Sequence, residues 1–353
     1  MVQLFGESLS RRELLRRVGS VKQIGGIELV ELLDGPERGN RAAVFRTGSG
    51  FQFTVLPDRA LDIAQASFAG IPIGWISPSG RTAPSFYDAR GDEWLRSFFG
   101  GLLTTCGLTY AGAPCSDEGQ ELGLHGRISN IPARNVGVEE AWQGDELVMK
   151  IYGEVHEAKV FQPTLVLKRE ISTRLGESKL WIRDTVENVG FEPSPHMIIY
   201  HMNIGFPVVD DGSRLVCTSK EVIPRDQDAE SGLNEYQVFT KPIPGFREHV
   251  FYHDLEPDKK GLVTVGIANE KRQIAVRVTY LKEQLPRFVE WKMMGESVYV
   301  VGIEPSNCWV EGRDKERQRG TLVYLEPGEK RSYELEVAFL QGEDALEFAK
   351  QGC

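Results

Sequence analysis

Apolar and polar side chains alternate along much of this chain, and the alternation predicts β-strands. In 51–55 the apolar residues Phe51, Phe53 and Val55 recur at every second position, so they share one face of a strand. Similar strand-like segments are 147–155, 164–173, 180–186, 274–280 and 297–303. Near the C-terminus another strand pair, 321–325 and 332–340, flanks Pro327-Gly328, a dipeptide that favours a turn.

Helical patterns are scarce in the rest of the sequence. Segment 8–18 begins with Ser8, a candidate helix cap, and 343–350 predicts a short terminal helix. We find no low-complexity linker, internal repeat or change of composition that would divide the chain. The sequence therefore predicts an all-β sandwich or barrel, with a helical lead over 1–20 and a single β domain over 21–353.

The charge and the cysteine content limit which partners and which cell compartment we expect for this protein. The 353 residues include 41 basic and 51 acidic ones, a net charge of −10, which argues against nucleic-acid binding. No apolar segment is long enough for a signal peptide or a membrane span. The five cysteines form an odd, scattered set without a Cys-x-x-Cys pair: Cys106, Cys115, Cys217, Cys308 and Cys353. This set indicates a reducing compartment, so we expect a cytoplasmic protein without nucleic-acid or membrane partners.

Three titratable residues stand where chemistry is expected. Glu304 ends an apolar run just before Pro305, and strand ends hold functional groups on a rigid scaffold. His201 follows another apolar run, and His125 lies between Leu124 and Gly126. A carboxylate and two imidazoles are suited to proton transfer. The alternatives are a surface carboxylate, a core histidine with a buried partner and a loop histidine bonded to backbone.

Five further residues are candidate substrate-binding groups. Asn203 shares a strand face with His201. Lys292 follows Trp291, a pairing that suits sugar stacking and hydroxyl recognition, although a lysine lying along an apolar surface is an equal alternative. Arg59 could fork onto ligand oxygens or pair with a neighbouring aspartate. The remaining two lie beside the titratable residues, Arg127 and Asn307.

A metal site has weaker support. His249 and His253 have the spacing of a helical metal-binding pair, but neither a helical pattern nor a third ligand accompanies them. A site of two histidines and one carboxylate, formed by His125, His201 and Glu304, is the remaining metal alternative. We therefore expect no metal and no cofactor.

Four short motifs in order resemble the aldose 1-epimerase (galactose mutarotase-like) superfamily, particularly an uncharacterised branch of it. They are Leu124-His125-Gly126-Arg127, Tyr200-His201-Met202-Asn203-Ile204-Gly205, Gly302-Ile303-Glu304-Pro305-Ser306-Asn307 and Leu325-Glu326-Pro327-Gly328-Glu329. The resemblance covers roughly residues 20 to 345 and implies a β-supersandwich with a cleft across one concave face.

The resemblance also implies roles for residues. Glu304 corresponds to a glutamate base, His201 to a histidine acid and His125 to a sugar-binding histidine, while Arg59 takes the substrate-binding arginine role. The usual Asn-His-x-Tyr-Phe-Asn-Leu segment is replaced here by Tyr-His-Met-Asn-Ile-Gly. No counterpart of the family's sugar-binding aspartate is identified.

The predicted function is therefore that of an isomerase which interconverts the anomers of a sugar by acid and base catalysis. One alternative is an isomerase, epimerase or lyase for an acidic or modified sugar, whose negative charge Arg59, Arg127 and Lys292 would neutralise. Another is a carbohydrate-binding protein without turnover. A small carbohydrate is the expected partner in each case, and a homodimer is left open.

Overall fold

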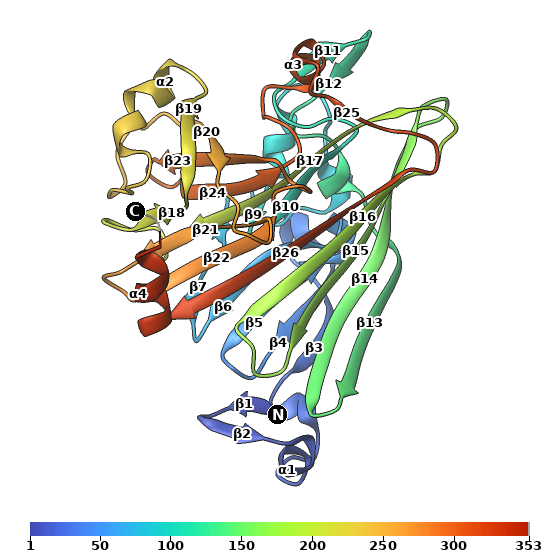
Figure 1. The fold of residues 1–353 in the computed structure, drawn as a ribbon. Coiled ribbons are helices and arrows are strands. Elements are labelled where there is room, and N and C mark those ends of the chain that lie inside the picture. Colours follow the sequence, from blue (N-terminus) through green and yellow to red (C-terminus); the bar gives the residue numbers. More distant parts are fainter. Residues whose placement is uncertain (352–353) are drawn as a thin grey trace.

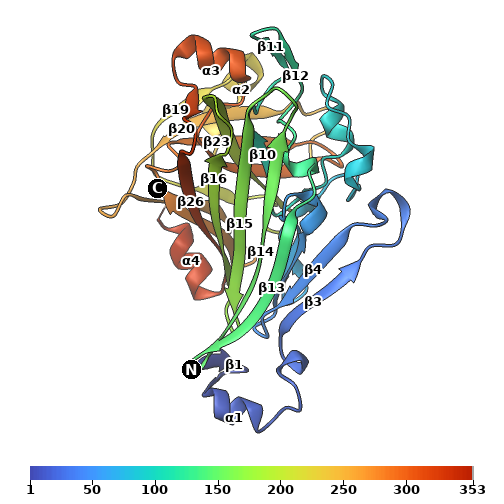
Figure 2. The same cartoon turned by 90° about the vertical axis from the view of Figure 1, so that its right-hand side faces the viewer.

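Two large antiparallel sheets form the body of the protein. They are seen in a computed structural model that describes residues 1–351 (Figure 1). The eight-stranded sheet has, in spatial order, β13 (Arg134–Gln143), β14 (Glu146–Ala158), β15 (Thr164–Arg174), β16 (Lys179–Asn188), β26 (Lys330–Gln341), β22 (Ile274–Leu281), β21 (Leu262–Asn269) and β18 (Arg214–Val216). Figure 2 shows its long strands β13 to β16 side by side with β26.

The seven-stranded sheet carries the residues of chemical interest. Its order is β10 (Thr104–Leu108), β17 (Ser194–Gly205), β24 (Tyr299–Ser306), β23 (Arg287–Met294), β20 (His249–Leu255) and β19 (Ser219–Pro224), with β25 (Val323–Leu325) paired to β17. The central position of β17 and β24 gives each of them a hydrogen-bonded neighbour on both sides. Such strands hold their side chains more rigidly than a loop does.

Smaller units complete the fold. A five-stranded sheet has the order β3 (Gly26–Glu31), β4 (Arg41–Arg46), β5 (Phe51–Leu56), β6 (Asp62–Phe68) and β7 (Ile71–Pro72). The two-stranded pairs are β1 (Val2–Leu4) with β2 (Glu7–Leu9), β8 (Trp75–Ile76) with β9 (Gly100–Gly101), and β11 (Cys115–Asp117) with β12 (Gln120–Leu122). The α-helices are short: α1 (Arg11–Leu15), α2 (Gln227–Ser231), α3 (Arg313–Arg319) and α4 (Glu343–Ala349).

The main hydrophobic core lies between the sheets. Inward side chains from the eight-stranded sheet, such as Ile151 and Ile182, join the same buried cluster as Ile198 and Met202 of β17 and Ile303 of β24. Along strands of the eight-stranded sheet such as β16, buried residues that face the core alternate with more exposed residues on the other face. The strand pattern read from the sequence therefore follows from burying one face of each sheet.

The predicted all-β class is confirmed. Six predicted strand segments fall within β5, β14, β15, β16, β22 and β26, while 297–303 and 321–325 overlap β24 and β25, which begin two residues later. The terminal helix is also confirmed, as α4. The predicted break at Pro305 is wrong, because β24 continues to Ser306 and Pro305 stays in register opposite Phe288 of β23. Glu304 thus lies within a strand and not beyond its end.

The N-terminal helix is shorter than predicted. Residues 7–9 pair with 2–4 as a hairpin, so the helix begins only after Ser10. Ser10 caps it in a reciprocal arrangement with Glu13. Leu4 and Leu14 are buried in the main core. The separation of 1–20 from 21–353 stays a prediction.

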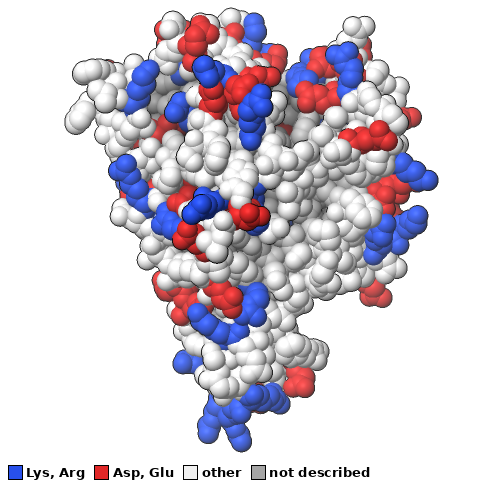
Figure 3. Space-filling view, turned by 180° about the vertical axis from the view of Figure 1, so that it is seen from behind, with Lys and Arg blue, Asp and Glu red and all other residues white. Residues whose placement is uncertain are grey.

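Charged side chains of both signs are spread over the face of the molecule shown in Figure 3. Acidic and basic ones intermingle there, and basic ones gather at the lower tip, where α1 lies in Figure 1. Within residues 1–351, no helix is long and apolar enough to cross a membrane. The four cysteines in this range are unpaired thiols, and Cys353 lies outside it.

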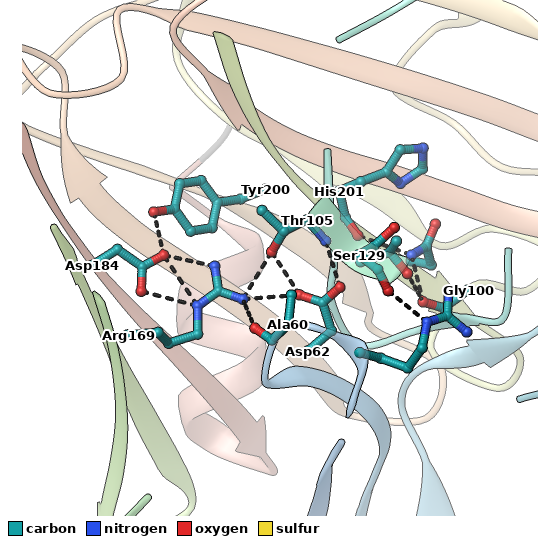
Figure 4. A network of polar contacts seen from close by, with 12 residues as sticks. Ala60, Asp62, Gly100, Thr105, Ser129, Arg169, Asp184, Tyr200 and His201 are labelled. Atoms are coloured by element: carbon teal, nitrogen blue, oxygen red, sulfur yellow. Dashed lines mark hydrogen bonds and ion pairs between the residues drawn. The ribbon is translucent and has the colours of Figure 1, made fainter. Parts of the chain in front are cut away.

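One buried ion network joins the three largest sheets. Arg169 of β15 donates to Asp184 of β16 at 2.6 Å and to Asp62 of β6 at 2.9 Å, and all three side chains are fully buried (Figure 4). Asp62 accepts from the backbone and hydroxyl of Thr105 in β10 at 2.9 and 2.6 Å. The hydroxyl of Tyr200 in β17 donates to Asp184 at 2.7 Å. Each charge is thus paired and hydrogen-bonded, which a buried ion requires.

We predict that Arg169→Met lowers the free energy of unfolding by about 3 to 5 kcal/mol, because it leaves two buried carboxylates without their cation. Urea denaturation followed by circular dichroism measures the change. The matched control is Arg183→Met on β16, whose exposed side chain pairs with Glu170 at the surface. Equal stability of the two variants would contradict the structural role of Arg169.

Candidate active site

The alternation of side chains along β17 separates a core face from a site face. Tyr200 and Met202 belong to the main core, while His201 points to the opposite side of the strand (Figure 4). On β24, Ile303 faces the core and Glu304 faces the side of His201. The register that pairs Ile199 with Ser306 also sets His201 opposite Glu304. Adjacent strands therefore bring these two predicted residues together.

Glu304 and His201 form a buried pair. Glu304 Oε1 lies 3.2 Å from His201 Nε2, and both side chains are almost fully buried. Gly302 makes room for this contact, since a β-carbon there would lie 2.6 Å from Glu304 Oε1 and 3.3 Å from His201 Cε1. Packing of the pair thus explains why a glycine stands two residues before the glutamate in the sequence motif.

His125 reaches the pair from a loop that follows β12. Its ring lies 5.7 Å from the His201 ring, centroid to centroid, and almost perpendicular to it. The backbone of His125 bonds to Gly112 and Gly107, and Gly126 packs against the carbonyls of Gly107 and Tyr110. The glycine at 126 is therefore needed for close contact between backbone segments. The structure brings together all three predicted titratable residues.

These side chains line a cavity of about 420 Å³ whose walls are rich in aromatic rings. The rings of Phe98 and Trp291 lie 5.3 and 5.4 Å from that of His201, and Trp94 lies 4.8 Å from His125. The full lining comprises Trp75, Ser77, Pro78, Ser79, Trp94, Leu95, Phe98, Ala113, Leu124, His125, His201, Arg225, Glu248, Val250, Val289, Trp291, Val298, Glu304 and Val310. A cavity of this size and character is typical of a small-molecule site.

The apolar walls change the protonation of the pair. Burial, together with the nearby Glu248 carboxylate, raises the pKa of Glu304 to about 8. Burial, with His125 beside it, holds the pKa of His201 well below its usual range. Burial likewise lowers the pKa of His125 to about 4. At neutral pH the pair therefore holds one proton, on Glu304, beside a neutral imidazole.

Arg225 and Glu248, which sequence reasoning missed, also line the cavity. Arg225 follows the end of β19 and Glu248 precedes the start of β20. Arg225 Nη2 lies 2.9 Å from Glu248 Oε1, and the indole N–H of Trp291 donates to Glu248 Oε2 at 2.8 Å. Both residues lie at strand ends, the feature from which Glu304 was predicted, but neither belongs to a recognisable sequence motif.

Two predicted binding residues lie elsewhere. Arg59 is fully buried and donates to the backbone carbonyls of Ser129, Thr82 and Ser97, so its guanidinium group has a structural role. Lys292 is two residues from Glu290 on β23, so the two side chains share one face of the strand, and Trp291 lies on the opposite face. Its ammonium group donates to the carbonyls of Glu235 and Val238 at 2.6 and 2.8 Å. Neither residue lines the cavity.

The other three candidates also do not line it. Asn203 lies beside the site but donates to the carbonyls of Gly100 and His201. Asn307 joins β24 to β17, accepting from the Ile198 amide and donating to the His196 carbonyl. The exposed Arg127 side chain lies over the ring of Tyr87. These amides and this guanidinium group support the architecture around the site.

The geometry does not favour the metal alternatives. In the part of the chain that the structure describes, no group of three or more His, Cys, Asp and Glu side chains is placed to hold a metal ion. His249 and His253 lie on strand β20 and not on a helix, and His253 pairs with the buried Glu290 at 3.4 Å. The candidate site is a carboxyl and imidazole pair in an aromatic cavity.

Comparison with known proteins places the chain in a family. The family model described as "Domain of unknown function (DUF4432)" matches residues 37–339. The chain belongs to this family. No curated protein matches the sequence.

Solved structures show the same fold. A "putative aldose 1-epimerase" from Klebsiella pneumoniae subsp. pneumoniae MGH 78578 has 26% identity and a TM-score of 0.87, with 92% of this chain and 85% of that chain covered. A galactose mutarotase-like protein from Clostridium acetobutylicum has 15% identity and a TM-score of 0.63, covering 91% and 100%. The galactose 1-epimerase of Lactobacillus acidophilus NCFM has 12% identity and a TM-score of 0.58, covering 90% and 100%. The resemblance predicted from the four motifs is confirmed.

We predict that Gly302→Ala separates Glu304 from His201, because the added methyl group occupies the space beneath the carboxyl. The His201 Nε2 resonance, measured by ¹⁵N NMR, should move towards that of an imidazole without a carboxyl partner. Crowding should cost about 1 to 3 kcal/mol of stability. Gly19→Ala is the control, since a β-carbon at Gly19 meets no atom within 4 Å. An unchanged His201 resonance in Gly302→Ala would contradict this packing role.

Proposed function

We propose that this protein interconverts the anomers of a sugar by acid and base catalysis at Glu304 and His201. The observation that carries the proposal is the 3.2 Å contact between a carboxyl and an imidazole at the wall of an aromatic cavity. The fold shared with aldose 1-epimerases supports the same reading. Aromatic walls suit the apolar faces of a sugar ring.

Anomer interconversion requires two coupled proton transfers. The C1 hydroxyl loses its proton and the ring oxygen gains one, the ring opens, the C1–C2 bond rotates and the ring closes again. Both oxygens are bonded to C1, so the acid and the base must lie close together. The pair of Glu304 and His201 meets this requirement within one hydrogen-bond length.

One proton in the pair is sufficient for this cycle. Moving it from Glu304 to His201 across their contact forms a carboxylate base and an imidazolium acid, the roles that the family resemblance implies. Glu304 then takes the hydroxyl proton while His201 protonates the ring oxygen, and the proton count of the pair is unchanged. His125, whose ring lies 5.7 Å from that of His201 in the cavity wall, is the candidate for bonding a sugar hydroxyl, since its buried Nδ1 has no partner in residues 1–351. The protein groups supply both transfers, and we propose no cofactor.

The cell compartment follows from the same proposal. An intracellular sugar isomerase would work in a reducing environment, and the four free thiols are compatible with the cytoplasm.

We predict that Glu304→Gln abolishes enzymatic anomer exchange, lowering kcat by at least about 100-fold, because glutamine neither takes up nor releases the proton. Exchange NMR of a panel of aldoses measures the rate against the uncatalysed background. Glu290→Gln is a matched control, since this buried carboxyl also pairs with a histidine but faces away from the cavity. Full activity of Glu304→Gln would refute the assignment of the base.

The same variant should be more stable than the parent protein at pH 8. The pKa of Glu304 is about 8 in the folded protein, above its ordinary value of 4.5. The free energy of unfolding therefore falls as pH rises from about 4.5 to 8, because the carboxyl ionises in the unfolded state but not in the folded one. Glutamine removes this penalty. We expect a melting temperature higher by about 2 °C or more at pH 8 and a smaller gain at pH 5. This gain separates loss of chemistry from loss of fold.

We further predict that kcat/KM is level from mildly acidic pH to neutral pH and falls as pH rises through about 8. Above that pKa the pair loses its single proton, and no acid remains for the ring oxygen. Rates at each pH are corrected by those of Glu304→Gln under the same conditions, which removes base-catalysed background exchange. A corrected rate that increases from pH 7 to 9 would show that Glu304 acts only as an ionised base, contrary to the shared-proton cycle.

A further inference from the structure

The cavity walls offer a substrate few hydrogen-bonding groups. Beyond the catalytic pair, the partly exposed wall is formed largely by Trp75, Leu95, Leu124, Trp291, Val298 and Val310. Trp75 and Trp291 meet edge to face, with 6.4 Å between their centroids, so indole rings line two sides of one corner. A hydroxyl group buried against such walls without a partner loses free energy relative to water.

The serine hydroxyls in the lining are already bonded to backbone. Ser77 donates to the carbonyl of Phe98 and Ser79 to that of Leu95. Outside the catalytic pair, hydroxyl recognition therefore depends mainly on His125, Glu248, Arg225 and the indole N–H of Trp94, which has no partner within residues 1–351. This set is small for a hexose, which carries a hydroxyl on almost every carbon.

The charge of the cavity opposes an anionic substrate. Among the lining residues in the described chain, Arg225 is the only lysine or arginine. Its guanidinium group is held by two carboxylates, Asp226 at 2.7 Å and Glu248 at 2.9 Å. The three cations considered for an acidic sugar, Arg59, Arg127 and Lys292, do not line the cavity. An incoming anion would therefore meet Glu248 without a cation left to neutralise it.

Glu248 is instead well placed to accept hydroxyl groups. Arg225 and Trp291 fix its two oxygens from different sides, and a carboxylate with two donors retains acceptor capacity. Its side chain is about half exposed at the cavity, so a ligand can reach it. A rigidly held acceptor among apolar walls recognises the few hydroxyls that a substrate presents.

From these contacts we infer that the cavity selects an uncharged sugar with an apolar part, such as a deoxy position or an alkyl or aryl substituent, and that Glu248 accepts its hydroxyl groups. The inference rests on the proposed function and narrows its substrate class. The apolar part lies against the tryptophan and leucine side chains, while C1 faces Glu304 and His201.

The test compares matched reducing sugars: D-galactose and D-glucose, their 6-deoxy forms, their 6-O-benzyl forms and their uronic acids. Exchange NMR gives kcat/KM, and the fluorescence of the cavity tryptophans gives binding to the Glu304→Gln variant. We expect 6-deoxy or 6-O-benzyl sugars to exceed their parent hexoses, and the uronic acids, by about tenfold or more in both measurements. Equal or greater preference for the parent hexoses or the uronic acids would overturn the inference.

Two variants locate the source of the preference. Glu248→Gln removes the negative charge but keeps the shape, so it should weaken the rejection of uronic acids by about tenfold. Glu256→Gln, a surface carboxylate paired with Lys220, is its control. Leu95→Asn should reduce the preference for deoxy over parent sugar, whereas Leu29→Asn on the exposed face of β3 should not. Uniform loss with every sugar in Glu248→Gln would assign that residue a structural role only.

The two proposals fail in different ways. If sugars with an apolar part bind Glu304→Gln preferentially but the parent protein does not exchange their anomers, the proposed function is refuted and the proposed specificity is retained. Exchange with a preference for parent hexoses would retain the function and remove the specificity. Absence of both binding and exchange across the panel would overturn both.

Discussion

The paired charges of Arg169, Asp62 and Asp184 are the interaction on which the rest of the structure depends. Arg169 and Asp184 come from adjacent strands of the eight-stranded sheet and Asp62 from the five-stranded sheet, and each charge would be costly to bury alone. Thr105 and Tyr200 extend the bonding to the sheet that carries the site. Because Tyr200 directly precedes His201, the same network that joins the sheets also fixes the strand from which the histidine projects. Consecutive residues of β17 thus belong to the buried ion network and to the candidate site.

The site places two titratable groups where neither keeps its ordinary pKa. Aromatic and aliphatic walls penalise both the Glu304 carboxylate and the His201 imidazolium, so the pair rests in its neutral form. An apolar cavity would normally exclude such groups. Their direct contact offsets part of the cost, since a single proton shared between two acceptors leaves no net charge. In the specificity we propose, the same apolar walls also restrict the substrate.

Local patterns found the three titratable residues that meet at the cavity, whereas the five predicted binding residues do not line it. Glu304, His201 and His125 carry motif signatures, and the structure brings them together. Arg59 and Lys292 were chosen because a cation near a site suggests a ligand. Their nitrogens are instead occupied by backbone carbonyls. Strand parity alone could have placed Lys292 on the face away from Trp291. Glu248 and Arg225 stand at strand ends but belong to no motif, and their contact joins positions 23 residues apart in the chain.

The sequence by itself determined the all-β class, most strand segments, the family resemblance and the three titratable residues. These features depend on local periodicity and on short motifs, which survive without knowledge of long-range contacts. Tertiary structure alone decided that β24 continues through Pro305, that Arg59 supports backbone and that Glu248 faces the cavity. It also decided the protonation of the pair. The physical reason is that burial, sheet register and charge pairing are properties of neighbours in space, and those neighbours are distant in the chain.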